Sequence, residues 1–157
     1  MAKPIPTGYH AITPHLVIKG ADGAIEFYKR AFGAEELVRM PMPGADGQMR
    51  LGHGELQIGD SKLFLADEYP EHGITGPSGA SPVTIHLYVD DVDTVFNRAV
   101  EAGAKAIMPP ADMFWGDRYG KLVDPFGHHW SVATHIEDPT PEQMKERMAA
   151  MVGGGCN

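Results

Sequence analysis

The chain has 157 residues, a length typical of one domain, and it carries 21 acidic against 13 basic residues for a formal net charge of −8. This acidic balance excludes a nucleic-acid-binding or anionic-membrane-binding surface, because both need clustered positive charge. No apolar stretch is long enough for a transmembrane helix, and a lone cysteine, Cys156, excludes an intramolecular disulfide and a CxxC motif. Since 43% of the residues are hydrophobic, a sizeable core can form, and we expect a cytoplasmic enzyme or binding protein.

One pattern of elements occurs twice along the chain. Apolar and polar residues alternate over residues 10–18 and again over 83–89, which predicts a strand at the start of each half. A helical pattern follows each strand, beginning near Asp22 or Asp91 and ending at Gly33 or Gly103. Three strand-like stretches then follow in each half, near residues 36–40, 49–58 and 62–67 and near residues 105–108, 118–123 and 129–135. The repeat predicts an α+β fold of two tandem βαβββ modules.

The two modules are expected to form one domain over residues 1–157, because neither could cover both faces of its sheet alone. We place the first module at about 8–72, a linker rich in Gly, Pro and Ser at about 73–82, the second module at about 83–137 and a C-terminal helix at about 141–151. Thr140 and Gln143 have the spacing of a capping box at the start of that helix. Met144, Met148 and Met151 share one helix face, which is expected to pack on the domain or on a dimer partner.

Four motifs in order give the sequence a resemblance to a known superfamily. They are Ala24–Tyr28 with Phe32–Ala34, Leu87–Asp93, Phe114–Gly120 and Asp124–Ser131. In these, from residue 8 to about residue 150, the chain resembles the vicinal oxygen chelate superfamily, which contains glyoxalases, bleomycin-resistance proteins and extradiol dioxygenases. Within it the chain is similar to the PhnB-like branch. The resemblance implies that the paired modules form a curved mixed sheet around a small-molecule pocket, but the fold alone does not define the chemistry.

The resemblance also implies where a metal would bind. In metal-using members a His or Gln on the first strand and a Glu on the last strand of each module hold one divalent cation. Those positions fall on Thr13 and Thr84 and on Leu63 and Ser131, none of which is a good ligand. The usual metal site, and with it glyoxalase or dioxygenase activity, is therefore not expected.

A displaced metal site is an alternative. His15 and His86 lie two residues beyond Thr13 and Thr84, and strand alternation is expected to point all four side chains into the pocket. The same parity predicts Asp67 and His135 on the pocket side of the closing strands. Imidazole and carboxylate groups at His15, His86, Asp67 and His135 could hold Zn, Ni, Fe or Mn. The other interpretation is that the histidines line the pocket and form hydrogen bonds with ligand or backbone.

Further residues are candidates for catalysis or ligand contact. His53 and Glu55 share a strand face, so Glu55 could act as a general base assisted by His53 if that face lines the pocket, and they are a solvated strand face if it does not. Trp115, Asp117 and Arg118 could clamp an aromatic or carboxylated ligand, or could form a buried turn. The expected ligand contacts are Thr13, His15, Thr84, His86, Tyr88, Trp115, Asp117, Arg118 and Ser131. The adjacent His128 and His129 point to opposite faces of a strand and are interpreted as structural or surface residues.

Three functions fit these observations. The first is a metal-free protein that binds a small, planar or aromatic organic compound, with Tyr88 and Trp115 as stacking surfaces. The second is a lyase, isomerase or dioxygenase-like enzyme that uses a metal displaced to His15 and His86. The third is a fold retained for assembly or regulation. A homodimer is expected in each case.

Overall fold

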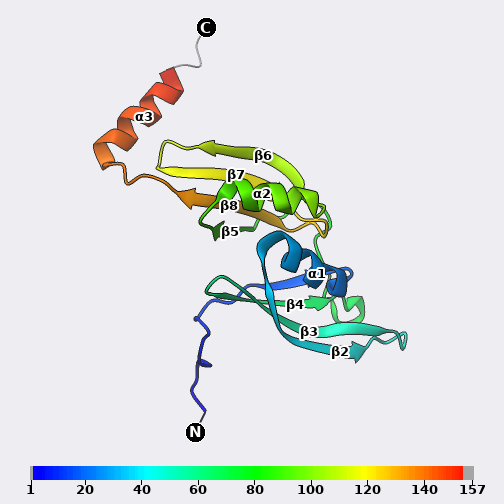
Figure 1. Ribbon diagram of the computed structural model, residues 1–157. Helices are drawn as coiled ribbons and strands as arrows, with labels where there is room; N and C mark the ends of the chain where they lie inside the picture. Colours follow the sequence, from blue (N-terminus) through cyan, green and yellow to red (C-terminus); the bar gives the residue numbers. More distant parts are fainter. Residues whose placement is uncertain (1, 154–157) are drawn as a thin grey trace.

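The computed structural model describes residues 2–153, so Cys156 lies outside the described residues. The first module consists of β1 (His15–Ile18), α1 (Ala21–Phe32), β2 (Glu35–Pro43), β3 (Met49–Ile58) and β4 (Ser61–Asp67). The second consists of β5 (Thr84–Tyr88), α2 (Val92–Glu101), β6 (Lys105–Asp112), β7 (Asp117–Val123) and β8 (His129–His135). A short 3-10 helix, η1 (Pro70–His72), lies between the modules, and α3 (Pro141–Gly153) follows them (Figure 1).

Each module forms its own four-stranded mixed sheet, in the orders β1-β4-β3-β2 and β5-β8-β7-β6. The first strand of each module pairs with the last strand in parallel, and the remaining pairs are antiparallel. This architecture confirms the predicted tandem βαβββ modules and the short C-terminal helix.

The two module helices begin with different caps. At α1, Gly20 has a left-handed backbone (φ 87°), and Asp67 from the end of β4 accepts hydrogen bonds from the N–H groups of Gly20 and Ala21 at 3.0 and 2.9 Å. The helix therefore begins at Ala21, near Asp22 as predicted, but Asp22 lies in the first turn and is not the capping residue. At α2, Asp91 accepts from Thr94 N at 3.1 Å, which is the expected aspartate cap.

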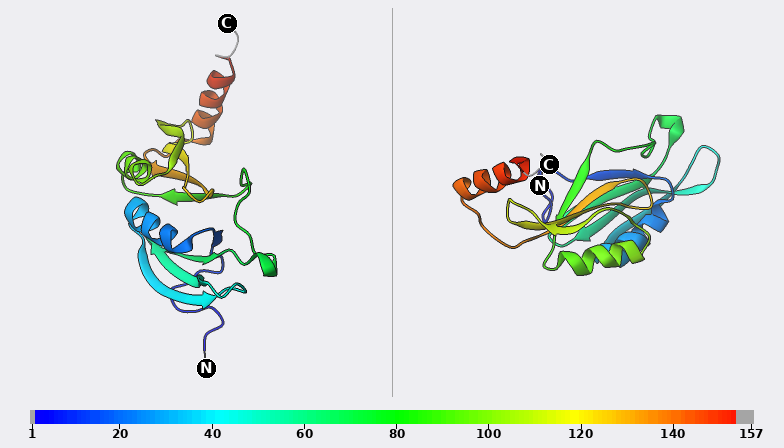
Figure 2. Two further views of the ribbon diagram at one scale, coloured as in Figure 1. Left: turned by 90° about the vertical axis from the view of Figure 1, so that its right-hand side faces the viewer. Right: turned by 90° about the horizontal axis from the view of Figure 1, so that it is seen from above.

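Both helices lie on the same side of the molecule and pack against each other (Figure 2). Each covers one face of its sheet and leaves the other open. The core under the helices is continuous through both modules, with Phe27, Tyr28, Leu65, Trp130 and Val132 among its fully buried side chains. The open sheet faces are therefore the places where polar side chains are free to act.

Hydrogen bonds fix the two modules to each other. The Tyr28 hydroxyl of α1 donates to the Asp124 carboxylate at 2.5 Å, and Trp130 Nε1 donates to the same oxygen at 3.0 Å. His128 Nε2 lies 2.9 Å from the carbonyl oxygen of Val17, so this histidine joins the modules. Burial and the charge of Asp124 raise the pKa of Tyr28 well above its ordinary value, which keeps its hydroxyl a donor.

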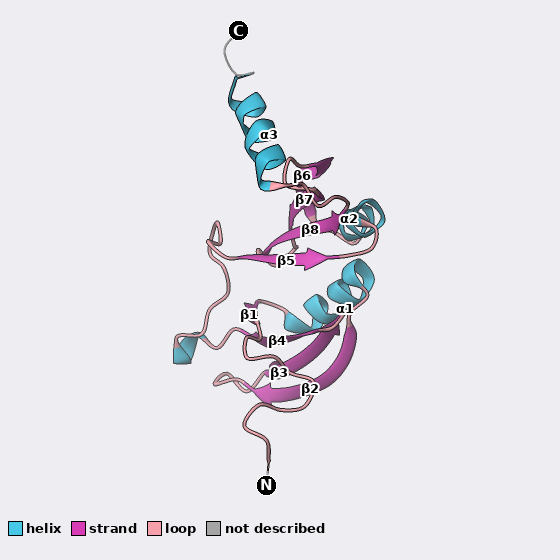
Figure 3. Ribbon diagram, turned by 90° about the vertical axis from the view of Figure 1, so that its left-hand side faces the viewer, coloured by secondary structure: helices cyan, strands magenta, loops and turns pink. Residues whose placement is uncertain are grey.

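The C-terminal helix α3 stands away from the two sheets (Figure 3). Its first turn has the predicted capping box, because Thr140 N donates to Gln143 Oε1 at 2.8 Å and Gln143 N donates to Thr140 Oγ1 at 3.2 Å. No residue of α3 is buried, and Met148 and Met151 are 49% and 64% exposed, so this part of the methionine face is open to solvent. Within residues 2–153 no helix is long and apolar enough to cross a membrane.

Candidate functional site: two open sheet faces and a cavity between the modules

The open face of the second sheet carries a strip of aromatic rings. In β5, Thr84, His86 and Tyr88 point to this face, whereas the alternate residues Ile85 and Leu87 point toward the core. The His86 ring lies 4.5 Å from the Tyr88 ring, edge to face, measured between centroids. It also stacks on Tyr119 of β7 at 5.8 Å with an interplanar angle of 21°. Trp115 continues the strip, 5.6 Å from Tyr119.

Three of these rings, those of His86, Tyr88 and Trp115, are held by hydrogen bonds to residues on the same face. His86 Nδ1 lies 2.7 Å from Ser131 Oγ, across the β5–β8 pair. Tyr88 Oη and Trp115 Nε1 both donate to Asp117 Oδ2, at 3.1 and 3.0 Å. Tyr88 is nevertheless 59% exposed, so the strip is fixed in place and open to solvent at once.

Asp117 is the buried anchor of this face. Asp117 is only 3% exposed, and its second carboxylate oxygen, Oδ1, lies 2.7 Å from His135 Nδ1. Burial opposes ionisation, but the hydrogen bonds from His135, Tyr88 and Trp115 outweigh it, so the pKa of Asp117 lies below its ordinary value. Hydrogen bonds to Asp117 and Asp138 raise the pKa of His135. Asp117 therefore orients the aromatic rings and is not free to bind a ligand cation.

Arg118 does not belong to this face. Its guanidinium forms two hydrogen bonds with Asp93 of α2, at 2.6 and 2.9 Å, and one with Asp112 at 3.0 Å. Because side chains alternate along β7, Arg118 lies on the helix side when Asp117 lies on the open side. The expected ligand clamp of Trp115, Asp117 and Arg118 is thus not assembled, since only the first two converge.

The open face of the first sheet has a different set of side chains. Glu55 accepts a hydrogen bond from the Tyr9 hydroxyl, and its other oxygen lies 2.9 Å from His53 Nε2. His15 contacts His53 edge to face at 6.4 Å, and Phe64 packs under both histidines. The Tyr9 and His53 hydrogen bonds lower the pKa of Glu55. Partial burial, together with the charge of His53, lowers the pKa of His15.

The usual metal positions of the superfamily do not hold metal ligands here. His86 pairs with Ser131 across the parallel strands of the second module, and His15 pairs with Phe64 in the first. The counterpart of Ser131 is therefore Phe64, and the assignment to Leu63 was wrong by one residue. Leu63 is buried on the helix side of β4. A phenyl ring and a hydroxyl offer no site for a divalent cation, so these positions do not fit the metal.

The displaced metal site is not assembled either. Asp67 lies on the helix side of β4, where one oxygen caps α1 and the other accepts from Leu51 N at 2.6 Å. Its predicted place beside His15 was wrong, because β4 alternates from Phe64 on the open face to Leu65 and Asp67 on the covered face. His15 and His86 lie on different sheets, and His135 is bound to Asp117. Within residues 2–153 no group of three or more His, Cys, Asp or Glu side chains could hold a metal ion.

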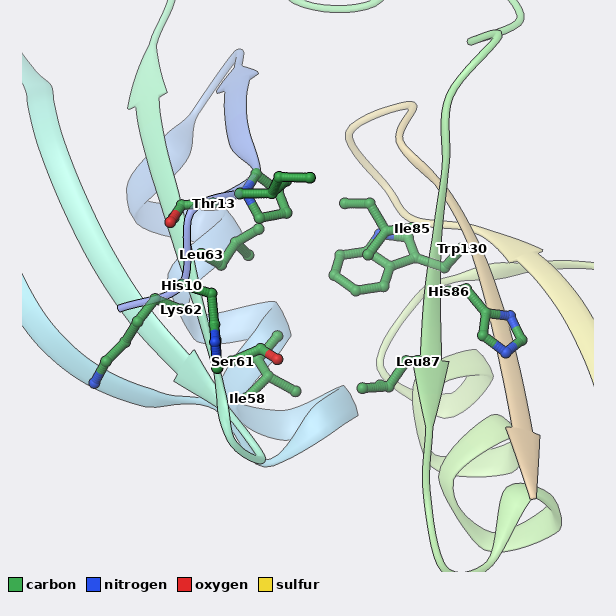
Figure 4. A pocket seen from close by; sticks show the side chains of 12 residues that line it. His10, Thr13, Ile58, Ser61, Lys62, Leu63, Ile85, His86, Leu87 and Trp130 are labelled. Carbon is green, nitrogen blue, oxygen red and sulfur yellow. The ribbon is translucent and has the colours of Figure 1, made fainter. Parts of the chain in front are cut away.

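A cavity of about 240 Å³ lies between the modules, behind β5 as seen from the aromatic strip. Figure 4 shows Ile58, Ser61 and Leu63 of the first module facing Ile85, Leu87 and Trp130 of the second. His86 also borders this space, but its ring points away from it to the other side of β5 (Figure 4). Thr13 lines the cavity as well, so it is separated from the other predicted ligand contacts.

Sequence reasoning missed three residues of these faces. Tyr9 lies before β1 in irregular chain, where no periodic pattern marks it. Phe64 and Tyr119 lie in regular strands, and alternation from Glu55 and Asp117 respectively would have found them once the strand pairing was known.

Tandem βαβββ modules with an open, polar and aromatic sheet face define a protein of the vicinal oxygen chelate class. Residues 9–132 match the profile of the Glyoxalase/Bleomycin resistance protein/Dioxygenase superfamily, and the chain belongs to this superfamily. It is 42% identical over 149 residues to an uncharacterized protein of Mycobacterium bovis, an alignment that covers 92% of this chain and 95% of the relative.

Solved structures agree with this assignment. The fold is similar to that of TioX from a Micromonospora species, with a TM-score of 0.63 at 26% identity, over 81% of this chain and 99% of that one. It is also similar to a PhnB protein of Bacillus cereus, with a TM-score of 0.63 at 22% identity, over 80% of this chain and 99% of that one. The PhnB-like fold predicted from the four motifs is thereby confirmed.

Proposed function

We propose that this chain is a metal-free small-molecule-binding protein of the glyoxalase/bleomycin-resistance type, and that it binds a planar aromatic compound on the open face of its second sheet. The observation that carries the proposal is the strip of His86, Tyr88, Tyr119 and Trp115, whose rings lie 4.5 to 5.8 Å from their neighbours. Rings fixed by hydrogen bonds lose little conformational freedom on binding, and they offer large flat contact areas.

The donors on this face support recognition of a neutral or weakly polar ligand. Asp117 is already occupied by three donors, and Arg118 is paired with two aspartates on the other side of β7. A charged group of a ligand would therefore form no ion pair with Asp117 or Arg118. The outer nitrogen of His86 remains to orient a ligand through a hydrogen bond, whereas Ser131 is 2% exposed and its hydroxyl is paired with His86 Nδ1.

A second candidate function is acid–base catalysis at the face of the first sheet. It is favoured by the Glu55 carboxylate, whose side chain is 17% exposed and held between Tyr9 and His53. A general base works best when its pKa lies near the working pH, whereas these hydrogen bonds lower the pKa of Glu55. This direction supports Glu55 as a fixed hydrogen-bond acceptor more than as a catalytic base, and binding stays the first proposal.

We also propose that the protein acts in the cytoplasm as a homodimer. Both open sheet faces and the methionine face of α3 leave apolar side chains in solvent, including Met40, Met42, Tyr88, Met148 and Met151. Surfaces of this kind favour burial against a second copy. Sedimentation velocity measures the mass directly, and a monomer at all concentrations would contradict this part of the proposal.

The binding proposal is tested with planar aromatic probes such as acridine, naphthol and riboflavin. At least one is expected to raise the melting temperature and to bind saturably by calorimetry, with an affinity that falls about tenfold or more in a Tyr88→Ala or Trp115→Ala variant. Met148→Ala is the matched control, because Met148 is exposed on α3, away from the strip. Binding that survives both ring deletions would refute the site.

A further inference from the structure

The cavity between the modules is separate from the aromatic strip and has its own chemistry. Figure 4 shows its two walls facing each other, with Leu63 and Ile58 on one side and Ile85, Leu87 and Trp130 on the other. The strip residues His86 and Tyr88 lie on the opposite face of β5. A molecule in the cavity would therefore not touch the strip.

The size of the cavity limits its ligand to about one ring. An apolar cavity of about 150 Å³ can hold benzene, whereas drug-sized ligands use pockets of roughly 300–1,000 Å³. At about 240 Å³ this cavity fits a single aromatic ring with small substituents. Most of its lining side chains are aliphatic, and polar groups enter from the first module at His10, Thr13, Ser61 and Lys62. On the side of the second module, the Trp130 indole is 1% exposed and held by its bond to Asp124. That indole gives a ligand ring an aromatic partner.

Among the polar groups on the cavity wall, the Ser61 hydroxyl indicates the ligand's substituent. Ser61 lines the cavity and donates its hydroxyl hydrogen to Asp60 at 3.0 Å. Its oxygen lone pairs remain as acceptors, so the complementary ligand carries a hydrogen-bond donor. Lys62 also borders the cavity, but its ammonium donates to Gln57 Oε1 and lies over the Tyr9 ring, 5.6 Å from its centroid. With this cation engaged elsewhere, an anionic ligand gains little from it.

We propose that the cavity between the modules is a second binding site, which takes a neutral one-ring aromatic compound that carries a hydroxyl donor, as in phenol. The ring lies between Leu63 and Trp130, and the hydroxyl donates to Ser61. Because both modules contribute a wall, an occupied site binds the two modules together and stabilises the folded chain by mass action.

The test uses phenol with a protein whose only tryptophan is Trp130. The chain has two tryptophans, so Trp115→Phe leaves Trp130 as the sole reporter at the cavity. Phenol is expected to change the Trp130 emission saturably and to raise the melting temperature. Filling the cavity from either wall, by Leu63→Phe or by Ile85→Phe, is expected to weaken phenol binding about tenfold or more. Because the two substitutions lie on opposite walls, the test can still be made if one of the variants does not fold.

The contact between the phenol hydroxyl and Ser61 is tested by comparing phenol with anisole. Anisole has the same ring but no donor, and Ser61 is exposed at the strand end, so Ser61→Ala leaves the fold intact. Phenol is expected to bind about fivefold more tightly than anisole, and Ser61→Ala is expected to abolish this difference. A Tyr88→Ala variant should bind phenol as the parent does, which separates this site from the strip. No saturable response, or equal binding in the cavity-filled variants, overturns the proposal.

Discussion

The first module sets His15 opposite Phe64 across its parallel strand pair, and the second module sets His86 opposite Ser131 at the corresponding point. One strand further into each sheet, Gly54 and Gly120 occupy matched positions, since they pair with Leu65 and Val132. The residues beside these glycines also match, so that His53 corresponds to Tyr119 and Glu55 to Lys121. The backbone plan is thus repeated, while the chemistry on the open faces differs.

This difference assigns separate roles to the two faces. The first face carries an acid–histidine cluster around Glu55, and the second carries an aromatic strip anchored by Asp117. On the covered side of the sheets, different residues cap the two module helices. Asp67 caps α1 from the end of β4, and Thr134 caps α2 from the end of β8 by accepting from Val92 N at 2.8 Å. Matched positions therefore give matched variants, in which one module serves as the control for the other.

The largest effect is expected at the helix caps. Asp67→Ala removes an acceptor for three backbone N–H groups and should lower the free energy of unfolding by about 2–3 kcal/mol. Thr134→Val removes one such acceptor and should cost about 1 kcal/mol. Denaturant unfolding measures both. Equal losses would mean that the charge and the extra partners of Asp67 add nothing.

The matched glycines should respond unequally. A Cβ on Gly120 would lie 3.0 Å from the Phe96 ring and 3.1 Å from the carbonyl oxygen of Met108, neither of which can move easily. A Cβ on Gly54 would meet the ends of the Leu51 and Leu65 side chains, which can rotate away. Gly120→Ala is expected to destabilise the chain by about 1–3 kcal/mol and Gly54→Ala by less. Thermal unfolding of the two variants measures this difference in stability. A larger loss for Gly54→Ala than for Gly120→Ala would contradict this packing.

The bond between the modules is tested by two Tyr→Phe substitutions. Tyr28→Phe removes the donor to Asp124 and should cost about 1.5 kcal/mol, the contribution of one hydrogen bond to a charged group. Tyr69 is the control, because its buried hydroxyl has no hydrogen-bond partner among the described residues. Tyr69→Phe should therefore leave stability unchanged or raise it. A loss at Tyr69 as large as at Tyr28 would argue against the Tyr28–Asp124 bond as a link.

The smallest effect is a pH dependence at the anchor of the second face. Because the folded-state pKa of His135 is raised, its stabilising contribution is fully present below the unfolded value of about 6.5 and is lost as the pH rises through the folded value. His135→Gln should thus lower the melting temperature at about pH 6 and leave it nearly unchanged at about pH 9. The same loss at both pH values would show that the charge of His135 does not matter.

The sequence predicts the fold well because the strand and helix periods are regular and occur twice. The sequence predicts which side chains lie on the open sheet face only where a strand is regular from its first residue. In β5, alternation places Thr84, His86 and Tyr88 on the open face. In β4 the predicted pairing was shifted by one residue, which put Leu63 at the position of Phe64. The same shift put Asp67 on the wrong face of the sheet. A shift of one residue reverses every side chain of a strand, so the pairing must be known first.

Binding of a planar ligand to the aromatic face of the second module is proposed to need no metal. The most direct measurement is a calorimetric titration of the best planar probe into chelator-treated protein, with Tyr119→Ala and its first-module counterpart His53→Ala as the matched pair. We predict an affinity unchanged by the chelator and by His53→Ala, and weakened about tenfold by Tyr119→Ala. Binding that disappears with the chelator, or that depends on His53 and not on Tyr119, would contradict a metal-free site on the aromatic strip.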